Sequence, residues 1–454
     1  LAGTVVSGSS GELFKLVTAA GSVLRQQLGL GELSEPQATA LRAVRPTRPE
    51  VAQTYAQGRE LLRRFDAVGA HKLLEKVIAA DPDYSLGHFA MAEMWTALGY
   101  DEKAKAEARR ALEISSHLPR EDRYLIEARY REASKDWDKA ISAYQTLLTF
   151  FPDSLEYGLY LANAQLASGQ AALALETARR LHQLGPSADQ DPRLAILEAR
   201  ATSDAGDPQA AYTLLGRAVR QGEAIRAPLL VARAQLEAAY TLEYLGQHTR
   251  SLQSAAVAKQ LFLTAGDRSA AADALMVTGA AYMNQGDLAQ SLKAAQEAMD
   301  FLLGTENSAL TATTLCNMAL LLIKQGNLEL ARSRAEGGLA LAREIGLRET
   351  QGTAMIALGW NELLRGNMEN AGHWFMQATA IFSELGDPKM VAWADFHNGQ
   401  LLLWQGRLGE AEQQHREALT LRERHGLKGF AAESRVALAA VALEQNQPLT
   451  AETR

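Results

Sequence analysis

The chain has 454 residues, of which 47% are hydrophobic and 6% aromatic, with a formal net charge of −7 and one cysteine, Cys316. A single cysteine excludes an intramolecular disulfide and a zinc site built from thiolates. Acidic and basic side chains are interspersed, so we expect no nucleic-acid partner, and the longest apolar runs fall far short of the ~20 residues that direct membrane insertion needs.

Residues 1–49 are predicted to hold two helices outside any repeat. The stretch Gly11–Leu28 places its apolar residues on one helical face, and Glu35–Ala43 forms a second helical segment before Pro46 and Pro49. We interpret residues 1–49 as an amino-terminal helical cap or linker. The chain opens at Leu1 without a signal-peptide pattern, which suggests a fragment of a longer protein.

From residue 51 to residue 230, pairs of small residues return at intervals of about 34–37 residues, a period typical of helical repeats. Small side chains let two helices approach closely, so each pair is predicted to mark the contact inside one antiparallel helix pair. Prolines after Asp81, Phe151 and Gly185 should end second helices. The pairs are Gly58 with Ala70, Ala92 with Ala104, Ala128 with Ala140, Ala162 with Ala174, and Ala199 with Ala211.

Residues 231–454 repeat with a longer period. Turn residues recur every 40 positions at Gly246, Gly286, Gly326, Gly366 and Gly406, with Asn446 in register, and a second series runs from Gly266 to Gly426 between them. Each unit is therefore predicted to be a helix pair, because glycine ends one helix and a following Asp or Asn caps the next. The last unit is partial, since Ala451 lies only just inside its second helix.

The small-residue spacing, the helix-ending prolines and the Gly-Asp turns resemble tetratricopeptide repeats (TPR). The resemblance covers about residues 50–454, with ten complete repeats and one partial repeat. It implies an all-α fold, an α-solenoid of stacked antiparallel helix pairs that coil into a right-handed superhelix with the first helix of each pair on the concave side. The low aromatic content and abundant alanine favour the same all-α class, and arrays of this kind usually bind rather than catalyse.

A second resemblance concerns the context of the array. Gly11-Glu-Leu-Phe-Lys-Leu and Leu24-Arg-Gln-Gln-Leu-Gly-Leu, with the later phrases Trp137-Asp-Lys-Ala-Ile and Phe151-Pro-Asp-Ser-Leu-Glu-Tyr-Gly-Leu, resemble the junction and TPR region of some bacterial serine/threonine kinases of the eukaryotic type. The resemblance implies a carboxy-terminal sensor or docking region. None of the kinase's own motifs occurs in this chain, which has no Gly-rich phosphate loop, His-Arg-Asp or Asp-Phe-Gly.

No catalytic constellation emerges from the sequence. The nine histidines include no His-Glu-x-x-His and no pair four residues apart, so no metal site is predicted, and no cofactor is expected. Cys316 stands among apolar residues of a first helix and is predicted to be a buried, inert thiol. We therefore predict that this chain is not an enzyme.

Aromatic and methionine side chains on the later first helices form the candidate site. They would line an apolar groove if the first helices lie inside, and such side chains are typical anchors for a peptide or an amphipathic helix. The alternative is that they simply pack between successive repeats. The candidates are Tyr240, Tyr244, Met276, Met283, Trp360, Leu363, Trp393, Phe396 and Trp404.

The favoured hypothesis is a protein-interaction scaffold or regulatory region of a bacterial signalling protein that binds a protein or peptide partner. The Lys and Asn pattern of a carboxylate clamp is missing, because the corresponding helices offer Tyr55, Arg59, Phe89 and Glu93, and asparagines form no regular ladder. The alternative is a ligand-sensing or peptide-sensing module that controls a fused kinase or DNA-binding domain. Because no capping helix follows the last repeat, we expect either further sequence beyond Arg454 or end-to-end self-association. The compartment stays open between the cytoplasm and the exported side of an upstream membrane anchor.

Overall fold

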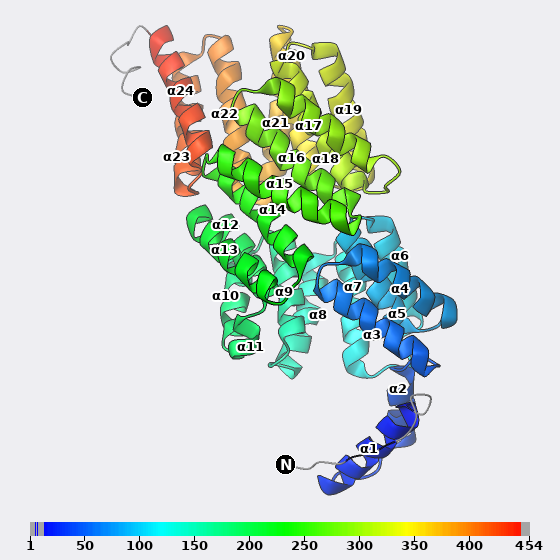
Figure 1. Cartoon of the computed structure of the whole chain (residues 1–454). Coiled ribbons are helices and arrows are strands. Elements are labelled where there is room, and N and C mark those ends of the chain that lie inside the picture. Colours follow the sequence, from blue (N-terminus) through cyan, green and yellow to red (C-terminus); the bar gives the residue numbers. More distant parts are fainter. Residues whose placement is uncertain (1–4, 6, 8–12, 446–454) are drawn as a thin grey trace. The chain divides into compact units, whose positions relative to one another are not determined.

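The computed structural model describes residues 5, 7 and 13–445, and over this part of the chain it contains 24 helices and no strand. The all-α prediction is confirmed. The chain divides into two compact units, residues 1–164 and residues 165–454, with the division inside helix α9 (Figure 1). Each unit is described by itself.

Two helices precede the repeats. The helices are α1 (Leu13–Gln27) and α2 (Glu35–Ala43), which agree with the predicted segments, while Gly11 lies outside the described residues. Helix α2 begins with a capping box, in which the Ser34 hydroxyl accepts from the Gln37 amide and the Gln37 side chain accepts from the Ser34 amide. Local sequence is therefore sufficient to start this helix.

The first unit continues with successive helix pairs. Asp66 caps its helix by accepting a 2.7 Å hydrogen bond from the Gly69 amide, and Phe65 and Lys135 take positive φ where glycine stands in later turns. The helices are α3 (Pro49–Arg63), α4 (Ala67–Ala80), α5 (Ser85–Leu98), α6 (Asp101–Glu113), α7 (Arg120–Ala133), α8 (Trp137–Phe150) and α9 (Leu155–Ala167).

The second unit holds the last of the shorter repeats and all of the longer ones. The turn glycines are left-handed, with φ of 70° at Gly246 and 83° at Gly286, and Asp267 and Asp287 cap the helices that follow. The helices are α10 (Ala171–His182), α11 (Pro186–Asp189), α12 (Pro192–Asp204), α13 (Pro208–Ala224), α14 (Pro228–Tyr244), α15 (His248–Ala265), α16 (Arg268–Asn284), α17 (Leu288–Leu302), α18 (Ser308–Lys324), α19 (Leu328–Glu344), α20 (Arg348–Leu364), α21 (Met368–Leu385), α22 (Pro388–Trp404), α23 (Leu408–Arg424) and α24 (Lys428–Glu444).

Small residues stand where the two helices of a repeat cross. Ser291 donates a 2.6 Å hydrogen bond to the Gly279 carbonyl, which brings the two backbones together. In two later repeats a large ring fills this crossing and the facing residue is glycine. A Cβ at Gly359 would lie 2.5 Å from the Phe375 ring. Glycine therefore stands where the opposite side chain of the helix pair is large.

First helices lie on the inner side of the curve in each unit. The first helices of successive repeats pack against one another, for example α18 on α20 and α5 on α7, whereas the second helices have at most marginal contact with one another. A stack in which only one layer makes such contacts must curve toward that layer. The predicted solenoid and its layer order are confirmed.

The second unit also closes on itself through a contact that we call the seam. Helix α14 packs against α24, and the turn at Gly246 approaches the start of α24 so closely that an added Cβ would lie 3.4 Å from the Gly429 Cα. Lys389 at the start of α22 pairs with Asp204 at the end of α12, 2.8 Å away. The predicted last repeat has α24 as its first helix, while its turn at Asn446 and the start of its second helix at Ala451 lie outside the described residues.

Candidate functional site

The inner side of the second unit is lined by one stripe on each first helix, which we call the inner row. The stripe follows helical spacing, so its members share the face that looks toward the neighbouring first helix. Contacts run along it from helix to helix. The inner row comprises Arg233, Glu237, Tyr240 and Tyr244 on α14; Asp273, Val277, Ala280 and Asn284 on α16; Thr313, Asn317, Leu320 and Lys324 on α18; Thr353, Ala357, Trp360 and Leu364 on α20; and Trp393, His397, Gln400 and Trp404 on α22.

Five of the nine predicted groove residues belong to this row. Trp404 is 49% exposed, and the other four are partly buried. Each keeps surface on the inner side of the array. These five side chains are Tyr240, Tyr244, Trp360, Trp393 and Trp404.

The other four predicted groove residues lie on a different face, which packs between helices. Met276 is 7% exposed and accepts from the Thr314 hydroxyl, Leu363 is 2% exposed, and Phe396 is 8% exposed. Met283 is partly buried against Met318. A shift of one position turns a helical side chain by about 100°, so these residues point at neighbouring helices, and the packing alternative describes them.

The carboxyl-terminal part of the inner row is aromatic and centred on His397. The His397 ring lies 5.4 Å from Trp360, 5.5 Å from Trp393 and 5.7 Å from Phe375, with Phe375 nearly parallel to it. The ring is 5% exposed, and over the described residues it makes no hydrogen bond to a protein group. Burial, together with the cations Arg422 and Lys324, lowers the pKa of His397 to about 3. This histidine is neutral at physiological pH.

A second buried histidine lies behind the first. His415 on α23 is completely buried in the position where Phe375 stands one repeat earlier, and its ring occupies the space that a Cβ on Gly399 would need. Neither ring nitrogen has a partner, and burial lowers the pKa of His415 to about 4. Leaving a buried polar group unpaired costs about 1–3 kcal/mol, so this region is not optimised for stability alone.

Lys324 brings positive charge to the same part of the row. Its ammonium lies 5.9 Å from the centre of the Trp360 ring, its side chain is exposed, and no carboxylate pairs with it among the described residues. The aromatic part of the row therefore carries an exposed ammonium group that forms no ion pair with a described residue.

The amino-terminal part of the inner row is polar and internally satisfied. The Tyr240 hydroxyl donates to the Asp273 carboxylate, and Arg233 pairs with Glu237 at 3.0 Å. Burial raises the pKa of Asp273, an effect that Arg233 and Tyr240 oppose. Tyr244 lies under the Lys389 ammonium at 5.2 Å, so it belongs to the seam as much as to the row.

The corresponding inner side of the first unit is filled by its own side chains. Arg59 pairs with Glu93, Arg129 donates to the same carboxylate at 3.2 Å, and the Tyr160 hydroxyl donates to it at 2.6 Å. Arg59 also donates to Tyr160, 101 positions away in sequence. Helices α3, α5, α7 and α9 are thereby tied together across the inner side.

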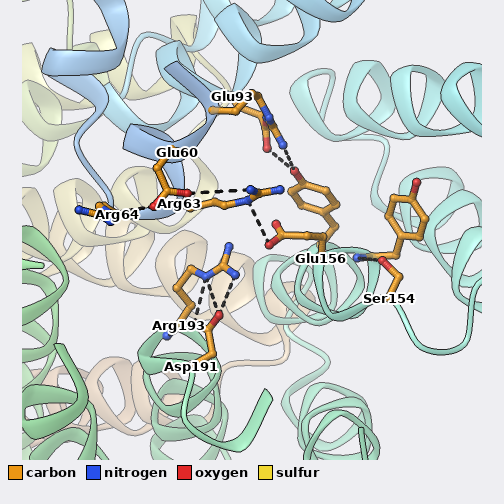
Figure 2. A network of polar contacts seen from close by, with 11 residues as sticks. Glu60, Arg63, Arg64, Glu93, Ser154, Glu156, Asp191 and Arg193 are labelled. Atoms are coloured by element: carbon orange, nitrogen blue, oxygen red, sulfur yellow. Dashed lines mark hydrogen bonds and ion pairs between the residues drawn. The ribbon is translucent and has the colours of Figure 1, made fainter. Parts of the chain in front are cut away.

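A more exposed ion network borders this arrangement. Figure 2 shows Arg63 between Glu60 of its own helix and Glu156 of α9, with the Arg63 Nε 3.5 Å from Glu156. Arg64 reaches the same Glu60 at 2.9 Å. Arg59 and Glu93, two of the positions noted as departures from a carboxylate clamp, are thus paired with each other.

Two further observations concern the thiol and the possible metal ligands among the described residues. Cys316 is completely buried, and burial raises the pKa of its thiol to about 12, as expected for an inert thiol. Within residues 13–445 no cluster of three or more histidine, cysteine or acidic side chains is arranged to hold a metal ion. None of the described helices is both long and apolar enough to cross a membrane.

Sequence reasoning missed the two buried histidines and Lys324. His397 and His415 were two of nine scattered histidines, and neither lies near the other in a recognisable motif. The available signal was the 40-residue register, which aligns His397 with the inner-row residues Ala357 and Val277, and aligns His415 with Phe375. Only the ring contacts reveal that these histidines share one aromatic cluster.

Comparison with known proteins supports the resemblance over part of the chain. Residues 310–384 match the family model described as Tetratricopeptide repeat. The predicted resemblance to TPR proteins is confirmed by this match together with the stacked helix pairs. A comparison with curated proteins finds no match.

Solved structures with the same kind of fold include two of similar extent. One is a Rap protein complexed with Competence and Sporulation Factor, with a TM-score of 0.55 and 16% identity over 74% of this chain and 98% of that chain. Another is the APC/C hetero-tetramer Cut9-Hcn1, with a TM-score of 0.50 and 14% identity over 97% of this chain and 89% of that chain. These likenesses show a shared helical-repeat fold. The exclusion of nucleic acid as a partner stays a prediction.

Proposed function

We propose that this protein is an interaction module whose second unit holds a peptide or helix of a partner protein against the inner row of its later repeats. The observation that carries the proposal is that the row exposes aromatic side chains and an ammonium group without an ion-pair partner. Trp404 is 49% exposed, Trp360 and Trp393 keep accessible surface, and Lys324 has no anionic partner among the described residues. Exposed aromatic side chains beside an unpaired cation are typical of a binding surface.

The shape of the surface favours an elongated ligand. The row continues from helix to helix on the inner side of a curved stack, and the seam brings the two ends of that stack together. A row of side chains that runs along the concave side of a curved stack suits a narrow chain better than a folded domain. The similar Rap structure contains a named factor as its bound partner, which is in keeping with this kind of ligand.

The resemblance to TPR regions of bacterial signalling kinases supports a regulatory role for the module. Ligand sensing is the second candidate, and the seam favours it. Lys389, Asp204 and Tyr244 link helices far apart in sequence through few contacts, so a ligand that changes the curvature would open or tighten them. Ligand binding would then change the conformation of the seam, and this change would be passed to a domain fused to the module.

Site-specific photo-crosslinking tests the interaction proposal. A benzoylphenylalanine residue is introduced either at Trp404 on the inner row or at Met376, which is 62% exposed on the second helix α21. We expect a discrete partner to be crosslinked in a lysate of the source organism from position 404 and not from position 376. Crosslinking only from position 376 would contradict the proposal, because the partner would then use the outer layer.

Purified partner then allows a quantitative test. The double variant Trp360→Ala/Trp393→Ala should weaken binding by at least about tenfold, as expected for aromatic anchors, while the fold survives because both residues are only partly buried. Unchanged affinity together with a large loss of stability would show that the two rings serve packing only.

Self-association also stays a proposal. Val436 is 70% exposed and Leu443 is 58% exposed on α24, and both stand at positions that are mostly buried in earlier repeats. Exposed apolar residues at helical spacing suit contact with another helix. Sedimentation velocity of the full chain should show concentration-dependent association that Val436→Glu removes, and purely monomeric behaviour at high concentration would contradict the idea.

A further inference from the structure

The cluster around His397 contains a polar group that the protein leaves without a partner. The ring is more than nine-tenths buried between Trp360, Trp393 and Phe375, and it lies on the inner row rather than on the outer layer. The unpartnered ring nitrogens of His415 are sealed from solvent, whereas those of His397 keep some solvent contact. A hydrogen-bonding group thus lies at the base of an aromatic site that solvent reaches.

The charges around this cluster decide which kind of ligand suits it. Aromatic clusters often attract cations, but the charged groups that act on His397 are the cations Arg422 and Lys324. Arg422 is held by Glu433 at 3.2 Å and by the Phe430 carbonyl, whereas Lys324 has no anion beside it among the described residues. The site therefore repels a cationic ligand and favours an anionic one.

We propose that Trp360, Trp393, His397 and Lys324 form an anchor site for a partner segment that carries an aromatic side chain next to an acidic side chain. The inference rests on the proposed function and names the chemistry of the ligand that the inner row would take. In this arrangement the aromatic ring of the partner segment packs against Trp360 and Trp393. The carboxylate faces Lys324, and a polar atom of the segment's backbone pairs with a ring nitrogen of His397.

Two exposed apolar side chains of the inner row lie next to the proposed anchor site. Trp404, 49% exposed, and Leu364, 37% exposed, continue the apolar surface beyond Trp360 in the adjacent row positions. An aromatic and acidic segment with flanking apolar residues therefore meets matching chemistry along three first helices, α18, α20 and α22. The polar, internally paired part of the row on α14 and α16 offers no such surface.

Short capped peptides that differ only in charge test the inference directly. The probes are acetyl-Ala-Glu-Phe-Ala-amide, its glutamine analogue and its lysine analogue, measured against the full chain by ligand-observed NMR at low ionic strength. We expect saturable binding in the order glutamate, glutamine, lysine, with each step about two- to fivefold, the range of a solvent-exposed ion pair. No saturable binding of the glutamate peptide below about 5 mM, or a preference for lysine, would overturn the inference.

Variants assign the preference to its residues. Lys324→Gln should abolish the preference for glutamate over glutamine while leaving the glutamine peptide's affinity unchanged, and Lys293→Gln, an equal change of charge on the exposed side of α17, should leave the preference intact. Trp360→Ala should weaken all three peptides by about tenfold. If Lys324→Gln and Lys293→Gln behave alike, Lys324 does not select the charge and the inference fails.

The two proposals fail in different ways. If the peptides show no charge preference but a partner still crosslinks from position 404, the inner row binds a partner of other chemistry and only the anchor-site inference is lost. If nothing crosslinks from position 404 and the peptides do not bind, both the anchor-site inference and the interaction proposal are contradicted.

Discussion

The inner sides of the two units show how one repeat design is used in opposite ways. In the first unit, Arg59, Glu93, Arg129 and Tyr160 satisfy one another across four first helices, so the inner surface is occupied by the protein's own charges. In the later repeats of the second unit, Trp360 and Trp393 keep accessible surface and Lys324 has no anionic partner among the described residues. A filled inner side stabilises, whereas an unfilled one is available to a ligand.

The strongest way to break this comparison is to remove a buried cation from the first unit. Arg129→Met leaves Glu93 and Glu132 with one charge too many in a site where the Arg129 side chain is 6% exposed. We expect a loss of about 3–5 kcal/mol in unfolding free energy, because an uncompensated buried charge is costly. Urea unfolding followed by circular dichroism measures it.

The matched control for this change is Arg131→Met on the same helix. Arg131 pairs with Glu127 and Asp136 but is 31% exposed, so its removal should cost less than about 1 kcal/mol. Equal losses for the two variants would mean that the buried network contributes no more than a surface ion pair.

Acid should weaken the second unit through its two buried histidines. The folded pKa is about 3 for His397 and about 4 for His415, against about 6.5 in the unfolded chain. Below pH 6.5 the unfolded chain binds protons that the folded chain does not, so the unfolding free energy falls as pH decreases. Between pH 6.5 and 5 each histidine should remove about 2 kcal/mol.

The variant His415→Phe isolates one of these contributions. Phenylalanine already occupies the equivalent position at Phe375, where it faces Gly359 as His415 faces Gly399. Stability measured at pH 7, 6 and 5 should decline less steeply in the variant than in the natural sequence. Parallel curves would show that His415 takes up no proton on unfolding.

A smaller loss of unfolding free energy is expected when a side chain is added at a glycine that packs against an aromatic ring. Gly359→Ala places a Cβ against Phe375 and should destabilise by about 1–3 kcal/mol, the usual cost of overpacking. In a Phe375→Ala background, which is itself destabilised by the cavity left behind, the same Gly359→Ala change should cost less, because the equivalent pair Ala319 and Ala335 exists one repeat earlier. A double-mutant cycle without coupling would exclude direct contact as the cause.

The smallest expected loss of unfolding free energy comes from a variant that weakens the seam. Lys389→Gln removes the ion pair with Asp204 and the ammonium above Tyr244, and because Asp204 is 45% exposed the cost should be below about 1 kcal/mol. Hydrogen exchange should nevertheless increase at α12 and at the start of α22. Unchanged exchange there would show that backbone contacts alone hold the seam.

The sequence alone determined most of the local structure. Glycines, caps and prolines recur with a fixed period, and each of them acts on its own helix end, so the helix pairs could be located from residues near in sequence. The small residues at helix crossings were also predictable, because every repeat needs the same close approach. The buried state of Cys316 followed from its apolar neighbours in the same helix.

Tertiary structure decided which side chains face the inner side and what they meet there. Met276, Met283, Leu363 and Phe396 differ from the inner row by a single step along the helix, and composition does not distinguish the two faces because both carry aromatic and aliphatic side chains. The pairs Arg59 with Tyr160 and Lys389 with Asp204 join residues 101 and 185 positions apart. Such contacts depend on curvature summed over several repeats, and no single repeat of the sequence encodes that sum.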